Sequence, residues 1–217
     1  EKLRKFGTSS VIHLALILVS LACLFPLLWA FASSLKTQST IFSNFAIFPE
    51  SPRWINYSEA WSRANFGLYL INSLFYSAVV VLCVILIASL AAFAFSRLKF
   101  PGKNILFILL ISTMMIPIPA TIIPLYVLVN KLGLINTRLG YVLLQINAGL
   151  ALGVFLLKTF FDDLPKELED SARIDGCSRF RVYWHIALPL AKPAIVVLAI
   201  FNILNVWNEY ILASLVL

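Results

Sequence analysis

Charged side chains concentrate in one stretch of an otherwise apolar chain, at residues 158–192, which we call the polar island. Residues 158–181 hold 11 of the chain's 27 charged side chains. Pro165 stands where the first residue of a helix is expected, and acidic residues follow in the first turn, as the helix dipole favours. Gly176 is a typical helix stop. The pattern predicts a short, rigid helix over 165–176.

One face of this predicted helix suits contact with another protein. Leu164, Leu168 and Ala172 recur at i, i+4 spacing, and Ser171 lies beside them. The small side chains of Ser171 and Ala172 would allow a partner to approach closely, and charges of both signs surround them. The residues alone leave two interpretations open: a docking element, or an amphipathic interfacial loop without a partner.

A second helix is expected to follow Gly176, with Ser178 as its N-cap. Its apolar face is predicted to lie along the membrane surface. The Leu188-Pro189 pair is expected to end this helix and turn the chain into the next apolar segment. The predicted face consists of Phe180, Tyr183, Trp184 and Ala187.

Polar side chains inside apolar segments form a second candidate site. They are Gln145 and Asn147 in one segment, and Asn202, Asn205 and Glu209 at i, i+3, i+7 spacing in another. Polar groups inside membrane spans are costly and often functional. Amides and carboxylates suit a hydroxyl-rich solute because each offers directional hydrogen bonds. The same groups could instead hold helices together, and both interpretations stay open.

The composition indicates a membrane protein. Hydrophobic residues make up 61% of the 217 residues and charged residues 12%, whereas soluble domains carry about 25% charged residues. The mean hydropathy is +0.93. The net charge of +7 comes from basic residues in short loops between apolar runs. That distribution is typical of membrane topology, so no nucleic-acid partner is expected.

Apolar runs long enough to cross a bilayer predict an all-α, polytopic membrane helical bundle. The third run contains Pro117, Pro119 and Pro124, which predict either a kinked packing helix or an element lining a path. The outer loop that follows the first run is expected to be ordered, with a short amphipathic piece. The five predicted spans are 11–32, 72–95, 105–129, 139–157 and 186–207.

The basic residues also predict the orientation. With the N-terminus in the cytoplasm, 12 of the 17 lysines and arginines lie on the cytoplasmic side and five lie outside. The positive-inside rule favours this arrangement, which places the polar island in the cytoplasm and the loop 33–71 outside. The chain ends at Leu217 within an apolar run, so we expect it to be a fragment of a longer protein.

Residues for catalysis or metal binding do not form a recognisable set. Cys23, Cys83 and Cys177 lack metal-ligand spacing, and His13 and His185 have no acidic or cysteine partner at ligand spacing. Neither HExxH nor GxSxG occurs. We therefore predict no catalytic residue, no metal site and no enzyme activity.

Several segments resemble one family. The run DSARIDG at 170–176 and the run HIALPL at 185–190 resemble the EAA loop of ABC importer permeases. The flanking runs FFDDLPKELEDSARIDG and FRVYWHIALPLAKPA are similar to the MalG-type subfamily, which serves carbohydrate uptake. NSL at 72–74, AAFAFSRLKFPGKN, MMIPIPATIIPLYVLVNKLGLINT and WNEY at 207–210 follow the same subfamily in order and spacing.

The resemblance implies a permease subunit in the inner membrane of a prokaryote. Two such subunits would form the path, a cytoplasmic ATPase dimer would dock on the island, and an extracytoplasmic binding protein would deliver sugar. ATP and Mg would bind the ATPase, with no cofactor in this chain. The family's usual Glu and first Ala are replaced by Asp170 and Ser171, which puts the pairing geometry in doubt. The implied coupling residues are Glu169, Asp170, Ser171, Ala172, Asp175, Gly176 and Pro189.

The resemblance also divides the chain. Residues 1–10 would be a cytoplasmic N-terminus, and residues 11–217 would be a permease domain. The core of that domain would be 72–217 and would include the coupling loop at 158–192. A sixth span would be missing from this chain. A secondary transporter is a rival interpretation, although we find no internal repeat and few ionisable groups in the spans. A non-catalytic membrane assembly subunit is another rival, which the sequence leaves open.

Overall fold

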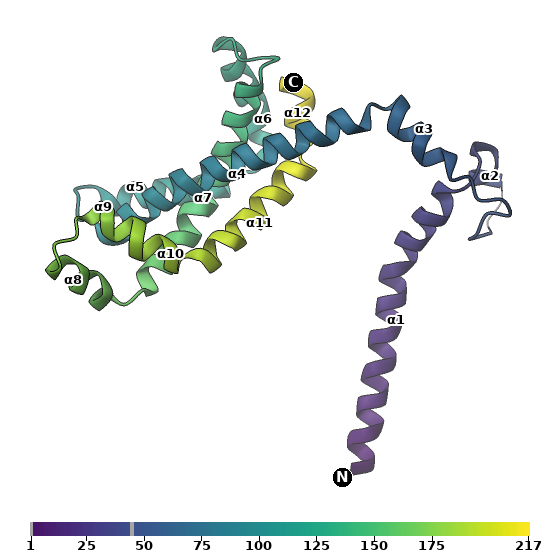
Figure 1. Ribbon diagram of the computed structural model, residues 1–217, viewed down its shortest axis with the longest axis horizontal. Helices are drawn as coiled ribbons and strands as arrows, with labels where there is room; N and C mark the ends of the chain where they lie inside the picture. The colour runs from purple at the N-terminus through teal and green to yellow at the C-terminus, as the bar shows by residue number, and fades with distance from the viewer. Residues whose placement is uncertain (1, 44–45) are drawn as a thin grey trace. The chain divides into compact units, whose positions relative to one another are not determined.

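The computed structural model describes residues 2–43 and 46–217, which form helices joined by turns and contain no strand (Figure 1). The predicted all-α class is therefore confirmed for this part of the chain. The chain folds into two compact units, Glu1–Tyr69 and Leu70–Leu217.

The first unit holds three helices and the start of a fourth, and the second unit holds the remainder. The first four helices are α1 (Lys2–Ser34), α2 (Gln38–Ser43), α3 (Ile55–Arg63) and α4 (Phe66–Arg97). The next are α5 (Lys103–Ser112), a 3₁₀ turn (Thr113–Met115), α6 (Ile118–Lys131), α7 (Arg138–Asp163) and α8 (Lys166–Ile174). The last are α9 (Arg179–Val182), a π-helical turn (Tyr183–Ala187), α10 (Leu188–Leu190), α11 (Lys192–Asn208) and α12 (Ile211–Val216).

The first unit contains the first predicted span and, among its described residues, hydrogen bonds that order parts of the loop after it. Residues Ile12–Ser34 of α1 are long and apolar enough to cross a bilayer. After them, the side-chain amide of Asn56 donates to the carbonyls of Ser34 (2.8 Å) and Lys36 (2.9 Å). The backbone N–H of Arg53 donates to the Leu35 carbonyl at 2.9 Å. These bonds fix the start of α3, the short amphipathic helix expected in this loop.

Three of the five predicted spans are unbroken helices and two are broken. The unbroken ones are Ile12–Ser34, Phe66–Arg97 and Arg138–Asp163, and counting each bent pair as one span gives up to five. Of the two interpretations of 105–129, the single kinked helix was wrong, because the chain turns by 109° between α5 and α6. The path-lining alternative stays a prediction.

The prolines explain this turn. Ile116 and Pro117 are extended, with ψ of 120° and 132°, because a residue before proline is pushed out of the helical region. Pro119 then lies in the first turn of α6, where its missing N–H costs little. Pro124 lies inside α6. The turn thus occurs where two prolines stand two residues apart.

The core of the second unit forms where α7 packs against α4 and α11 (Figure 1). Gly149 and Gly153 stand at the contact, in a GxxxG spacing that lets helices approach closely in membranes. A Cβ at Gly153 would lie 2.9 Å from the Ala88 Cβ of α4, and one at Gly149 would lie 2.2 Å from the Asn202 Oδ1 of α11. The helices therefore meet at a distance that only glycine permits.

Replacing Gly153 with Val is expected to push α7 away from α4 and Ala88. Overpacking of this kind costs about 1–3 kcal/mol, so the purified subunit should unfold at a lower temperature in detergent, measured by fluorescence-detected thermal unfolding. Ala148→Val adds methyl groups at an exposed position of the same helix and serves as the control. Equal losses of thermal stability in both variants would contradict the close-contact role of Gly153.

Candidate functional site

The polar island contains the predicted short helix, with slightly different ends. α8 spans Lys166–Ile174, so Pro165 is its N-cap rather than its first residue, and Asp175 is its C-cap. Gly176 has φ of +81°, the left-handed conformation that glycine adopts without strain. The N–H of Gly176 donates to the Arg173 carbonyl at 3.1 Å.

A further bond completes this helix stop. The N–H of Cys177 donates to the Ala172 carbonyl at 2.9 Å. Together with the bond from Gly176, it forms a Schellman motif, which satisfies two carbonyls at the helix end. The predicted role of Gly176 in ending the helix is confirmed, and α8 is a well-defined rigid element.

The outer surface of α8 differs from the predicted small-residue face. Ala172 is 9% exposed and packs into the core of the second unit. Asp170, Ser171 and Asp175 are exposed, and the Ser171 hydroxyl donates to a carbonyl of its own helix. Ile174 is 87% exposed. The free surface of α8 and its C-cap therefore combines exposed charges of both signs and one small hydroxyl with an unpacked isoleucine.

An ion pair fastens α8 to the end of α4. The Arg97 guanidinium donates from Nε to a carboxylate oxygen of Glu169. Its Nη2 also donates to the Leu164 carbonyl at 2.9 Å. The two charged side chains are only 8% and 15% exposed. Glu169 thus faces the transmembrane body, and α8 is held at both its first turn and the segment before it.

A second connection joins the later part of the island to α4. The hydroxyls of Ser89 and Tyr183 lie 2.8 Å apart, and both residues are buried. The Phe93 ring packs against Tyr183 at 5.3 Å and against Phe161 at 5.9 Å between centroids. The π-helical turn at Tyr183–Ala187 therefore lies against the body of the protein. π turns often mark functional sites.

The predicted membrane-facing surface of this second helix is only partly right. Tyr183 and Ala187 are each 1% exposed and point into the core, whereas Phe180 and Trp184 are 66% and 48% exposed. The expected turn into the next apolar segment is present, but it lies at Ala191, two residues after Pro189.

The helix runs on through the exposed Pro189, and the chain bends by 73° between Arg179–Leu190 and Lys192–Asn208. Proline is tolerated in the first turn of a helix. Pro189 in α10 and Pro193 in α11 both occupy such positions, which puts the bend at Ala191.

Two of the polar residues predicted inside the helices are joined by hydrogen bonds. Gln145 is 1% exposed. Its Nε2 donates to the Tyr141 hydroxyl at 3.1 Å, and its Oε1 accepts from Nδ2 of the exposed Asn205 at 3.4 Å. The structure therefore brings Gln145 and Asn205 together across α7 and α11. Tyr141 joins this pair without having been identified from the sequence.

The other three candidates have different surroundings. Asn202 is buried, and its Nδ2 donates to the Leu198 carbonyl one turn earlier at 2.9 Å. Asn147 is exposed. Glu209 lies beyond the last residue of α11, so it does not continue the predicted helical stripe. Its carboxylate instead accepts from the N–H groups of Leu212 (2.6 Å) and Ala213 (2.9 Å), which caps α12.

Arg97 belongs to the candidate site, although the sequence did not single it out. It follows a long apolar run and precedes Lys99 and Lys103, so it has the appearance of an ordinary basic residue at the end of a span. The one sequence feature that could have indicated a cationic partner was the pair of carboxylates in the first turn of α8. No spacing rule links it to a residue 72 positions earlier.

The described residues offer no metal site. Within residues 2–43 and 46–217, no group of three His, Cys, Asp or Glu side chains is arranged to hold a metal ion. What the arrangement provides is a rigid, charged surface element attached to a helical bundle, together with a buried chain of amides and a phenol.

Residues 84–217 match a protein family described as "Binding-protein-dependent transport system inner membrane component". The chain is 34% identical over 209 residues to the diacetylchitobiose uptake system permease protein NgcG of Streptomyces coelicolor, covering 96% of this chain and 68% of that protein. It is also 34% identical over 201 residues to the melibiose/raffinose/stachyose import permease protein MelC of Bacillus subtilis, covering 92% and 72% respectively.

A third relative and one solved structure agree with these matches. The probable starch degradation products transport system permease protein AmyC of Thermoanaerobacterium thermosulfurigenes is 34% identical over 201 residues, covering 93% of this chain and 73% of that protein. A chain from a bacterial ABC transporter involved in alginate import superposes with a TM-score of 0.81 at 24% identity, covering 99% of this chain and 75% of that chain. This last likeness supports the fold.

Replacing Arg97 with Gln is expected to loosen α8, because Glu169 would lose its buried partner. Breaking such a pair costs about 3–5 kcal/mol, so amide hydrogen exchange in Lys166–Ile174 should rise by about tenfold or more. Arg63→Gln, which removes the exposed pair with Glu59, should change exchange in α3 little. Unchanged exchange in α8 of the Arg97 variant would show that the ion pair does not hold the helix.

Proposed function

Because the chain belongs to the family of binding-protein-dependent transport system inner membrane components, we propose that it is a permease subunit of an ATP-driven carbohydrate importer. It is a membrane protein built of apolar helices. The names of three similar proteins refer to diacetylchitobiose, to starch degradation products and to melibiose, raffinose and stachyose. They support carbohydrate as the substrate class.

In this proposal the polar island is the docking site of a separate cytoplasmic ATPase. One observation carries it: α8 is fastened to α4 through the Arg97–Glu169 pair, yet presents Asp170, Ser171 and Asp175 to solvent. A carboxylate on a rigid helix can pair with a cation in a partner's cleft. ATP and Mg would bind to that partner, and this chain would contribute no catalytic residue.

The same contacts suggest how movement passes into the membrane. When the ATPase closes, α8 would move as a rigid body. Its motion would reach α4 through Arg97, and motion of the π-helical turn would reach α4 through the Ser89–Tyr183 bond. Two connections about two turns apart on one helix resist rotation better than one. The predicted result is a movement of α4 together with the island.

The remaining parts of the proposal concern topology and partners. The basic residues support a cytoplasmic N-terminus, with the loop 33–71 on the side from which a binding protein would deliver the sugar. Family membership supports a binding protein and an ATPase as partners. A second permease subunit would complete the path. A secondary transporter is not favoured, since the family's systems depend on binding proteins.

The solute path would pass the buried polar chain of α7 and α11. Tyr141, Gln145 and Asn205 provide a phenol and two amides, which can exchange hydrogen bonds with sugar hydroxyls. Asn205 is exposed while Gln145 is buried. Asn205 would therefore contact the solute, and Gln145 would hold its amide in position. Glu209 and Asn202 are engaged with backbone groups and would serve the helix framework.

Replacing Asp175 with Lys is expected to stop ATPase docking. Like-charge contacts at an interface cost several kcal/mol, so uptake of labelled sugar should fall by at least about tenfold while the subunit still inserts. Co-purification of the ATPase with this subunit gives a direct measurement. Gly176→Pro should have the same effect, because proline cannot adopt the φ of +81°.

Asp163→Lys is the matched control for this test. It makes the same charge change at an exposed position of the polar island outside α8, and it should preserve most of the uptake. Normal ATP-driven uptake by the Asp175→Lys subunit would contradict docking at α8. An ATPase that never co-purifies, even with the unmodified chain, would favour a membrane assembly subunit instead.

Replacing Asn205 with Ser distinguishes the solute path from helix bonding. If Asn205 contacts sugar, the KM ratio between a disaccharide and a trisaccharide should change by about threefold or more, with little change in thermal stability. If its bond to Gln145 only joins two helices, the melting temperature falls and the KM ratio stays the same. Asn208→Ser is the control, because that amide donates to Leu204 of its own helix.

A further inference from the structure

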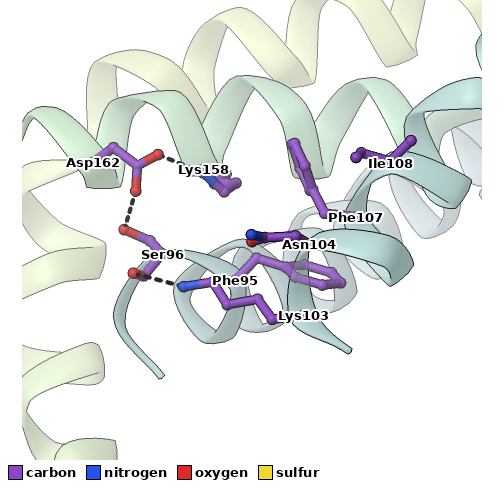
Figure 2. Close-up of a pocket in the computed structure, with 8 residues that line it drawn as sticks. All are labelled: Phe95, Ser96, Lys103, Asn104, Phe107, Ile108, Lys158 and Asp162. Atoms are coloured by element: carbon purple, nitrogen blue, oxygen red, sulfur yellow. Dashed lines mark hydrogen bonds and ion pairs between the residues drawn. The ribbon is translucent and has the colours of Figure 1, made fainter. Parts of the chain in front are cut away.

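A polar cavity lies outside the docking surface, where the end of α4, the start of α5 and the end of α7 meet (Figure 2). Its volume is about 330 Å³, which is the liquid volume of roughly ten waters and leaves room for a phosphodiester group. Neither the docking residues nor the buried amides belong to it. Its lining consists of Phe95, Ser96, Lys103, Asn104, Phe107, Ile108, Lys158 and Asp162.

Two ammonium groups from different helices face this cavity. The Lys158 Nζ lies 2.5 Å from an Asp162 oxygen and 4.9 Å from the centroid of the Phe107 ring. The Lys103 Nζ donates to the carbonyls of Ser96 (3.3 Å) and Leu98 (3.2 Å). An ammonium has three donors, so two remain on Lys158 and one on Lys103. Both side chains are held in place and still have donors for a ligand.

The charge around the cavity favours an anion. The Asp162 carboxylate neutralises the charge of one lysine, and it also accepts a hydrogen bond from the Ser96 hydroxyl at 2.6 Å. A shallower hollow adjoins the cavity through Lys103 and Asn104 and adds a third cation, Lys99. Three ammonium groups and one carboxylate leave an excess of positive charge at this spot.

An apolar surface begins directly beside these cations. Ile105 and Ile108 of α5 are 66% and 65% exposed, and Leu109 is 57% exposed. α5 is part of a bent pair long and apolar enough to count as a membrane span. The cavity therefore lies at the boundary between a lipid-facing surface and water. It is on the same side of the bundle as α8, since Ser96 lines the cavity and the next residue, Arg97, holds α8.

We propose that this cavity binds the headgroup of an anionic phospholipid such as phosphatidylglycerol. Lys103 and Lys158 donate to the phosphate oxygens, and the Asn104 amide and Ser96 lie within the same lining to contact the glycerol hydroxyls. The acyl chains extend along Ile105 and Ile108. A soluble phosphate would gain nothing from these exposed isoleucines, whereas a lipid uses the cations and the apolar surface together.

The bound lipid joins three helices at a mechanically important place. Lys103 belongs to α5, Lys158 to α7, and Ser96 stands next to Arg97 at the end of α4. A headgroup that contacts all three helices holds the end of α4 independently of the ion pair with α8. The lipid content of the membrane would then affect how firmly the polar island is held.

The test measures lipid retention on the complete transporter. The transporter is purified with its partner subunits in detergent micelles that contain phosphatidylglycerol and phosphatidylcholine. Native mass spectrometry counts the retained lipids. Lys103→Gln and Lys158→Gln are each expected to lower phosphatidylglycerol retention by about fivefold, and Lys131→Gln, which removes an exposed lysine elsewhere, should leave it unchanged. Equal retention in all three variants would overturn the proposal.

Two further measurements separate lipid binding from a structural ion pair and from a site for soluble anions. Asp162→Asn removes the ion pair with Lys158 but keeps the cation, so lipid retention should be equal or higher. If it falls as in Lys158→Gln, the ion pair is structural and the lipid site is rejected. Excess inorganic phosphate should not displace the lipid. Displacement by phosphate would show a site for soluble anions instead.

Discussion

The attachment of the polar island depends on one buried cation. Arg97 ends a long apolar helix, where a charge without a partner would be costly to remove from water. The Glu169 carboxylate and the Leu164 carbonyl each accept a hydrogen bond from the guanidinium, and both acceptors belong to the island. A hydrophobic pair in this place would stabilise the fold equally well, but it would permit sliding. The guanidinium instead fixes the position and the direction of α8, because its donors have a fixed geometry.

Close packing turns this local attachment into a property of the bundle. Gly149 and Gly153 bring α7 against α4 and α11, so α4 cannot shift without its neighbours. The buried Ser89–Tyr183 bond adds a second attachment between α4 and the island. Close-packed protein interiors have low compressibility and transmit strain. In the proposed function, the island and the membrane helices would therefore move as one unit, and a partner that displaces the surface of α8 would act on the whole core.

Local sequence signals predicted the local structures well. Gly176 marked the end of α8, and the apolar runs marked the helices, because both depend on neighbouring residues alone. The single kinked helix over 105–129 failed because proline shows that a helix is disturbed, without showing how far the chain turns. The prediction that Tyr183 faces the membrane was wrong. An apolar helix face can be covered either by lipid or by the protein core, and the sequence pattern is the same in both cases. Arg97 and Glu169 were beyond prediction since they are 72 residues apart and meet only through the packing of α4 and α8.

The buried amides illustrate a constraint that any membrane path must meet. Gln145 is buried, at 1% exposed, so its amide needs partners in the protein, and Tyr141 and Asn205 supply them. Asn205 belongs to this buried chain and also reaches the surface, since its side chain is exposed. Such an amide can exchange a weak 3.4 Å bond for one to a passing hydroxyl at little cost, whereas Asn202, bonded at 2.9 Å to its own helix, gains nothing by leaving. In the proposed path, the amide offered to the solute is therefore the one with the longer and weaker hydrogen bond.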